Sequence, residues 1–246
     1  MKRLPEIISI ILLTMFLAGN ATATETISVA VATNFLLPLE RLATTFTAET
    51  GIKVQSSASS TGKLYAQLKN GAPYDIFLAA DAKRPESLHT AGLAEKPITY
   101  ARGRVVLWTK DNTISAADWQ QALTNNPKRI AMANPDTAPY GLAAAMALNK
   151  TKMWGTIRPR LVFAQSAGQA FQYAERGATT FAFAALSYSI SDAGQQGKSW
   201  PISQAPQVVQ KGCIMKNSTK QQQAQRFLDF LLAPTGRKII AAYEYR

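Results

Sequence analysis

Four times in this sequence, an apolar strand-like run leads into a short polar stretch and then directly into a helix-like pattern. The four junctions span residues 29–35, 54–62, 130–141 and 162–168. Strands that alternate with helices in this way are typical of α/β proteins with mainly parallel sheets. The pattern predicts an α/β fold in which these turns lie at the carboxyl ends of the strands.

The residue types at the four junctions indicate what kind of ligand these junctions could bind. Ser, Thr, Asn, Ala, Pro and Gly predominate, and charged residues are almost absent. A helix N-terminus offers unpaired backbone N–H groups and the positive end of the macrodipole, so it can hold an anion without a cationic side chain. Each junction alone is more often only a helix cap. Together, the four favour a receptor for a small oxyanion.

The first residues predict export. Lys2 and Arg3 precede an apolar run over 7–18, and Ala21-Thr22-Ala23 has the small-x-small form of a cleavage site. This pattern is typical of a secretory signal peptide. We expect residues 1–23 to be removed after Ala23, and no later run approaches the 18 apolar residues of a membrane span.

The distribution of charge and the cysteine content limit which partners and which kinds of site this chain can have. The formal net charge is +12, but the basic residues are scattered, which favours a solvated surface with mild steering of anions over nucleic-acid binding. Cys213 is the only cysteine. An intramolecular disulfide and a multi-cysteine zinc site are therefore excluded, and we expect a buried thiol at this position.

Catalytic and metal-binding signatures are weak. The chain has one histidine, His89, and no G-x-S-x-G sequence, so a hydrolytic triad is not expected. The Ser60–Lys63 stretch has Ser57 and Leu64 where a phosphate-binding P-loop needs Gly and Ser or Thr. Acidic residues are isolated, so we expect no free metal cation, no cofactor and no enzymatic activity. An exported enzyme on the same fold remains the less favoured alternative.

The order of the elements predicts two lobes. Strands are expected at 27–32, 53–57, 75–79, 104–110, 129–133, 161–164, 180–185 and 208–215. Helices are expected at 35–46, 61–70, 85–91, 140–149, 167–176 and 220–232, and a last short helix is expected to end near 243. A further helix should begin at a capping box of Ser115 with Asp118 and run through Leu123, and residues 195–205 are expected to form a loop. The α/β pattern restarts after 104–110. We therefore predict lobe I from 24–106 plus 212–246 and lobe II from 107–211, with crossings near 104–110 and 208–215 and a ligand cleft between the lobes.

Four segments carry a family resemblance: Val31-Ala32-Thr33-Asn34-Phe35, the Ser57–Gly62 stretch, Asn70–Asp81 (NGAPYDIFLAAD), and Asn134-Pro135 with Ala138–Ala143. With them the mature chain resembles the periplasmic molybdate/tungstate-binding proteins of ABC transporters. The resemblance implies a two-lobed type II periplasmic binding protein with mostly parallel sheets and two hinge crossings. It further implies a monomer in the periplasm that binds molybdate or tungstate and delivers it to a membrane permease. A receptor for another tetrahedral oxyanion (sulfate, phosphate or chromate) is the alternative.

The resemblance also implies which residues bind the oxyanion. Carried over position by position, the donors fall on Thr33, Asn34, Ser60, Tyr140 and Ala167, with Thr61 as the rival of Ser60. Tyr140 and Ala167 would contribute backbone N–H groups. Some family members add a tyrosine hydroxyl at a position that here is Ala185. The chain therefore matches the branch with Thr-Asn in the first loop, and a fifth side-chain donor stays open.

Overall fold

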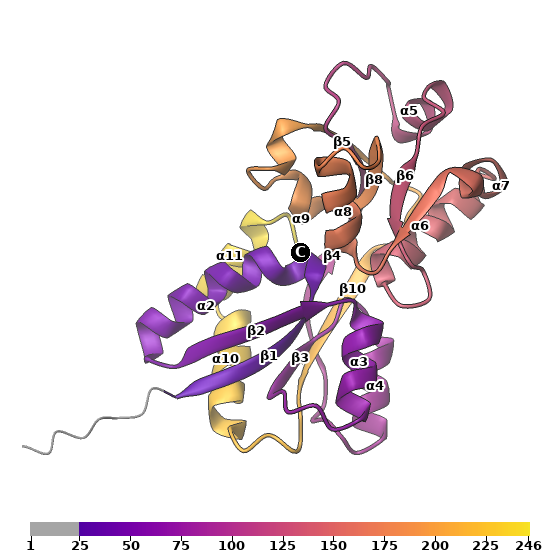
Figure 1. Ribbon diagram of the computed structural model, residues 1–246. Coiled ribbons are helices and arrows are strands. Elements are labelled where there is room, and N and C mark those ends of the chain that lie inside the picture. The colour runs from indigo at the N-terminus through magenta and orange to yellow at the C-terminus, as the bar shows by residue number, and fades with distance from the viewer. Residues whose placement is uncertain (1–24) are drawn as a thin grey trace, which may run out of the picture.

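The computed structural model describes residues 25–246. The predicted signal peptide over 1–23 lies outside the described residues. Two five-stranded sheets, each covered by helices on both faces, form two lobes (Figure 1).

The first lobe is built on a sheet with the strand order β2-β1-β3-β10-β4. Its strands are β1 (Thr26–Ala32), β2 (Lys53–Ser59), β3 (Ile76–Leu78), β4 (Ile98–Gly103) and β10 (Val208–Ile214). Alternate side chains of β1 face opposite sides, as a pleated strand requires. Val29 and Val31 pack with helices α2 (Leu36–Thr50), α10 (Gln221–Leu232) and α11 (Pro234–Ala242), whereas Ala30 packs with α3 (Thr61–Lys69) and α4 (Lys83–Thr90).

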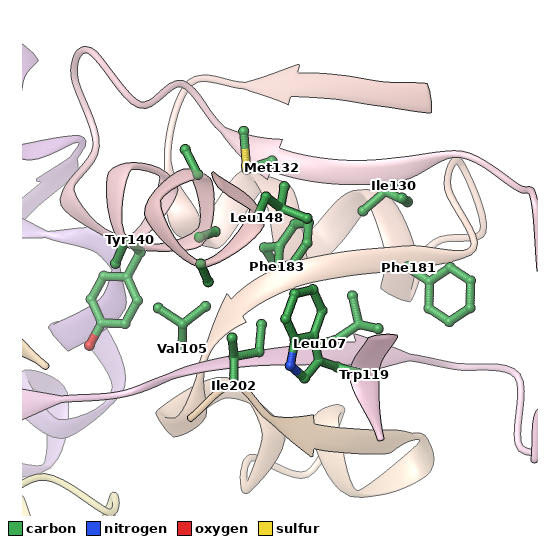
Figure 2. Close-up of a cluster of buried hydrophobic side chains, with 14 of the residues drawn as sticks. Val105, Leu107, Trp119, Ile130, Met132, Tyr140, Leu148, Phe181, Phe183 and Ile202 are labelled. Carbon is green, nitrogen blue, oxygen red and sulfur yellow. The ribbon is translucent and has the colours of Figure 1, made fainter. Parts of the chain in front are cut away.

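The second lobe has the strand order β7-β6-β8-β5-β9. Its strands are β5 (Val105–Thr109), β6 (Ile130–Ala133), β7 (Leu161–Ala164), β8 (Phe181–Ala185) and β9 (Lys198–Pro201). One face packs against α5 (Trp119–Asn125) and α6 (Pro139–Lys150), and the other against α8 (Ala167–Glu175). Figure 2 shows the first of these cores, in which Leu107 and Phe183 meet Trp119 and Leu148.

Short elements complete the chain. They are the 3-10 turns η2 (Thr33–Phe35), η3 (Arg158–Arg160) and η4 (Gly194–Gln196) and the one-turn helices α7 (Trp154–Ile157) and α9 (Leu186–Ser189). Within residues 25–246, no helix combines the length and apolarity needed to cross a bilayer.

The mostly parallel sheets expected from the sequence are mixed. β1 pairs in parallel with β2 and β3, and β6 with β7 and β8, but β10 and β5 run antiparallel to both of their neighbours. By sheet membership the chain passes between the lobes at Arg104 and again over 202–207. The predicted crossing segments 104–110 and 208–215 correspond to the strands β5 and β10, and each of these strands lies within a single sheet. The proposed lobe boundaries at 106/107 and 211/212 thus lie a few residues beyond the observed passages.

Two strands were missed, and each lacks the period-2 pattern by which strands are recognised. In β4, Tyr100 and Ala101 are adjacent and both buried, because a bulge interrupts the pairing with β10. β9 is a short edge strand within the expected loop 195–205, and only Trp200 of its four residues is buried. The cap of α5 also differs: Asp118, not Ser115, is the N-cap and accepts from Gln121 N at 2.8 Å.

Candidate functional site

The four strand-to-helix junctions meet at one small cavity between the lobes. Its lining residues are Ala32, Thr33, Asn34, Ser59, Ser60, Thr61, Ala80, Ala138, Pro139, Tyr140 and Ala167. None of these residues carries a charge. The centre of a water-sized sphere can reach about 10 Å³ of the cavity, which is about the space that one water molecule needs. A cavity of this size excludes an organic solute of ordinary size.

The first lobe contributes the turn after β1. Thr33 and Asn34 lie in η2, between the buried strand and α2, and Asn34 is only 2% exposed. The Thr33 hydroxyl oxygen accepts from Gly168 N of the second lobe at 3.1 Å. Its hydrogen stays available for an acceptor. Thr33 thus belongs both to the cavity wall and to the contact between the lobes.

The second contribution of this lobe is the start of α3, where Ser60 is the N-cap. The Ser60 hydroxyl accepts from Lys63 N at a long 3.4 Å, and the Thr61 hydroxyl accepts from Ala80 N at 3.1 Å. Both residues are almost fully buried. Because Thr61 is the first helical residue, its backbone N–H has no partner within the helix.

The second lobe presents the first turns of α6 and α8. Pro139 and Tyr140 are the first residues of α6, and Ala167 is the first residue of α8. Ser166 caps α8 by accepting from Gln169 N at 3.2 Å. The N–H groups of Tyr140 and Ala167 lie among those that an α-helix leaves unpaired, at the end where the macrodipole is positive.

Hydrogen bonds between the lobes surround the cavity. Gly62 N donates to Thr137 O at 2.9 Å, and the Tyr188 hydroxyl donates to Thr33 O. Farther out, the Lys63 ammonium donates to Gln165 Oε1 and the Arg84 guanidinium to Asp136 O. The two lobes are therefore in direct contact around the site.

A wider groove opens beside the cavity and shares Thr33 and Ser59 with it. Its other walls are α8 and the 191–193 segment, and they include the charged residues Glu175, Arg176 and Asp192. A solvent-open groove with both acidic and basic walls does not select a small anion. The smaller cavity, which is lined by the helix N-termini and has no charged residue, is the better candidate.

The buried tyrosines around the site remain uncharged. Burial raises the pKa of Tyr100 and of Tyr140 well above the ordinary value of 10. Burial also raises the pKa of Tyr188 and of Tyr245. Each hydroxyl therefore keeps its proton at neutral pH and adds no negative charge near an anion.

All five sequence-predicted residues, and Thr61, line this one cavity. Ala185 is buried inside β8 and has no side-chain donor. The nearby hydroxyl is that of Tyr188, three residues later, which bonds to Thr33 O. Sequence reasoning gave no role to Gly62, Gly168, Tyr188, Gln210 or Tyr245, because a contact between distant segments leaves no local pattern. Cys213 is buried as expected, and burial raises the pKa of its thiol to about 12.

Comparison with known proteins identifies the family of this chain. Residues 27–246 match the family of bacterial extracellular solute-binding proteins. A molybdate-binding protein ModA of Rhodobacter capsulatus is 35% identical over 95% of this chain and 92% of its own length. The ModA of Azotobacter vinelandii is 36% identical over 93% of this chain and 92% of its own length.

A solved structure shows the same architecture. The periplasmic molybdate-binding protein of Azotobacter vinelandii superposes with a TM-score of 0.84 at 37% identity, covering 89% of this chain and 98% of that one. The fold is thus the two-lobed periplasmic binding-protein fold with its ligand cleft between the lobes. The match spans nearly the whole of residues 25–246, both lobes included, and the chain belongs to the bacterial extracellular solute-binding proteins, a family of transport receptors rather than enzymes.

Proposed function

We propose that this protein captures molybdate or tungstate outside the cytoplasm and delivers it to the membrane permease of an ABC importer. The observation that carries the proposal is the convergence of four strand-to-helix junctions on one small cavity whose lining residues carry no charge. Relatives at 35–36% identity are molybdate-binding proteins. Thr33, Asn34, Ser60, Tyr140 and Ala167 are the proposed oxyanion-binding residues.

The donors divide into hydroxyl and backbone groups. The Ser60 and Thr61 hydroxyls each accept from one backbone N–H, of Lys63 and of Ala80, and each keeps its own hydrogen for an acceptor. We assign the donor of this loop to Ser60, as the family resemblance implies, with Thr61 as its rival. Asn34 uses its side-chain amide inside the protein, so we assign its backbone N–H to the ligand. Hydrogen bonds to a charged partner contribute about 1.5–3 kcal/mol each, so five such donors suffice for tight binding.

The absence of a carboxylate from the cavity lining bears on which oxyanion binds. Phosphate at neutral pH carries at least one proton, and a site that selects it gains from an acceptor for that proton. The lining residues include no Asp or Glu, which favours a fully deprotonated dianion. Sulfate has the same charge and shape as molybdate but is smaller, so we attribute its rejection to the cavity size set by the rigid strand ends.

A ligand panel tests this proposal. Thermal unfolding of the purified protein, measured with molybdate, tungstate, sulfate, phosphate or chromate, should show a raised midpoint with molybdate and tungstate, because a ligand that binds only the folded form stabilises it by mass action. A shift with sulfate or phosphate and none with molybdate or tungstate would assign the site to the alternative oxyanion. Hydrolytic or transfer activity would indicate the exported enzyme.

Two substitutions test the assigned residues. Thr33→Ala and Ser60→Ala should each weaken molybdate binding by about 1–3 kcal/mol, since each removes one hydroxyl from the cavity. Calorimetric titration measures the change. Ser87→Ala is a matched control, because the Ser87 hydroxyl donates to Lys83 O on α4 and does not line the cavity. Unchanged affinity in both site variants would move the site elsewhere.

Export, location and assembly state belong to the same proposal. The predicted signal peptide over 1–23 would place the mature protein, as a monomer, in the periplasm. There it would bind the ligand with closure of the two lobes, and the closed form would be the one that the permease recognises. The hydrogen bonds that cross between the lobes support a closed ligand-bound arrangement.

A further inference from the structure

A side chain outside the cavity joins its two walls. Gln210 lies on β10 of the first lobe and is fully buried. Its Oε1 accepts from Asn34 Nδ2 at 2.8 Å, and its Nε2 donates to the Tyr140 hydroxyl at 3.4 Å. Asn34 and Tyr140 are the proposed anion-binding residues of opposite lobes. One uncharged amide therefore contacts both.

A β-bulge directs this amide inward. The pairing of β10 with β4 shifts register between Gln210 and Lys211, so that Gln210 faces Ala101 and Lys211 faces Thr99. Tyr100 is the extra residue of the bulge, and its hydroxyl lies 3.1 Å from both Gln210 Oε1 and Ala79 O. Bulges of this kind re-aim side chains next to functional sites.

A second hydroxyl holds Asn34 from the other side. The Tyr245 hydroxyl donates to Asn34 O at 2.6 Å and lies 3.1 Å from Asn34 Nδ2. Ser187 of the second lobe also donates to Asn34 O, at 3.0 Å. The backbone carbonyl and the side-chain amide of Asn34 are thus both occupied, and the Tyr188 hydroxyl holds Thr33 O of the peptide unit that carries the Asn34 N–H.

Close packing leaves Tyr140 little freedom. A Cβ added to Gly103 would lie 1.9 Å from the Tyr140 hydroxyl oxygen. Gly103 is the last residue of β4, immediately before the chain passes to the second lobe. The Tyr140 ring therefore extends from the start of α6 to the passage between the lobes, where Gln210 meets it.

We propose that Gln210 is a positioning residue for oxyanion binding, which couples the donors of the two lobes by holding Asn34 and Tyr140 in register when the lobes are closed. Gln210 does not touch the ligand. Its amide acts through hydrogen bonds to residues that do, and its place on the strand that re-enters the first lobe ties them to the hinge. This inference rests on the proposed function.

The coupling predicts which rate changes. Ligand encounter takes place with the lobes apart, before the contacts of Gln210 with both walls are complete. Release requires those contacts to break. Loss of Gln210 should therefore speed dissociation and leave association nearly unchanged, which is the usual division of affinity effects between the two rates.

The experiment compares the wild-type protein with Gln210→Met, which keeps the length of the side chain and removes its hydrogen bonds. Molybdate titration and stopped-flow kinetics, well below the unfolding midpoint, should show about tenfold weaker binding and about tenfold faster dissociation. Thr109→Val is the matched control. The Thr109 hydroxyl is fully buried and donates to Thr180 O at 2.8 Å, so its loss should lower the midpoint without changing the affinity.

A double variant shows whether Gln210 acts through Tyr140. If it does, Gln210→Met should cost much less affinity in a Tyr140→Phe background than in the wild type. Additive effects would overturn the coupling. Equal affinity of Gln210→Met and wild type, even with a lowered midpoint, would show a merely structural role. Failure of the wild-type protein to bind any oxyanion would overturn the proposed function instead.

Discussion

At the scale of single residues, the candidate site depends on backbone N–H groups, which do not differ from one residue type to another. Tyr140 and Ala167 are placed by their position in a helix, and their backbone N–H groups are the same whatever the side chain. The side chain of Asn34 is likewise used inside the protein, in bonds to Gln210 and Tyr245. Substitution to Ala, the usual test of a site, leaves such donors intact.

Proline can remove one of these donors with little disturbance. Ala167 is the first residue of α8, where proline is favoured because its missing N–H has no helical partner. Its predecessor Ser166 already has extended dihedrals, φ −151° and ψ 165°, as a residue before proline prefers. Ala167→Pro should therefore weaken molybdate binding by about 1.5–3 kcal/mol with little change in the unfolding midpoint.

Calorimetric titration and thermal unfolding of the same sample measure the two quantities. Ala167→Gly is the control, because it keeps the N–H and removes only a methyl group. Wild-type affinity in the proline variant would exclude the Ala167 N–H as a donor.

At the scale of elements, the first turns of α3 and α8 approach the other lobe closely enough to require glycine. A Cβ on Gly62 would lie 2.9 Å from Thr137 O, and a Cβ on Gly168 would lie 3.2 Å from the Thr33 Cβ of the first lobe. Neither glycine has positive φ. The requirement comes from contact between the lobes and not from the local backbone.

Gly62→Ala should consequently separate folding from closure. Alanine favours the helix by up to about 1 kcal/mol, so the ligand-free protein should be as stable as wild type or more so. The added methyl group meets backbone and forces the lobes apart, so molybdate affinity should fall by about tenfold or more. Thermal unfolding without ligand and titration with ligand test the two effects.

Gly155→Ala is the matched control for this substitution. Gly155 also lies in a helix, and an added Cβ there would meet no atom within 4 Å. It should change neither affinity nor closure. If Gly62→Ala binds molybdate like Gly155→Ala, the approach of α3 to Thr137 is not part of the bound state.

At the scale of the whole molecule, the chain ends where the two lobes meet (Figure 1). The hydroxyls of Tyr140, Ser187 and Tyr245 are buried there and make hydrogen bonds. Tyr100, Tyr140 and Tyr245 are all buried. Glu244, the residue before Tyr245, has an unusual φ of +61°. These tyrosine hydroxyls stay protonated at neutral pH and therefore add no charge where the lobes meet.

This arrangement predicts a loss of stability at alkaline pH. The pKa of Tyr100, Tyr140, Tyr188 and Tyr245 is raised in the folded protein by burial, and the pKa of Cys213 is raised to about 12. Unfolded chains release these protons near the ordinary values of 9 for cysteine and 10 for tyrosine. The native state therefore binds more protons above about pH 9, and the free energy of unfolding must fall as pH rises.

Denaturant unfolding measured between pH 7 and 11 tests this effect. The contribution should be complete below about pH 9 and decrease steadily above it. Tyr100→Phe removes one titrating group and should make the decrease shallower. A free energy of unfolding that stays constant to pH 11 would contradict the burial of these hydroxyls.

Several features could be predicted from the sequence because local patterns determine them. Alternating strand and helix signals indicated the fold class, and polar junctions after apolar strands indicated an anion site, whereas Thr33, Asn34 and Ser60 were assigned as donors by the family resemblance. Family resemblance identified Tyr140 and Ala167 as backbone donors. The β4 and β9 strands were missed, since a bulge breaks the alternation of one and the other is a short polar edge.

The sequence by itself thus determined the α/β class and the polar junctions that lead from strands into helices. Only the tertiary structure decided where the chain passes between the lobes and that Gln210 and Tyr245 hold Asn34. The physical reason is distance along the chain. Helix caps and strand patterns depend on neighbours within a few residues, whereas Asn34 and Tyr245 are 211 residues apart and meet only when both lobes have folded.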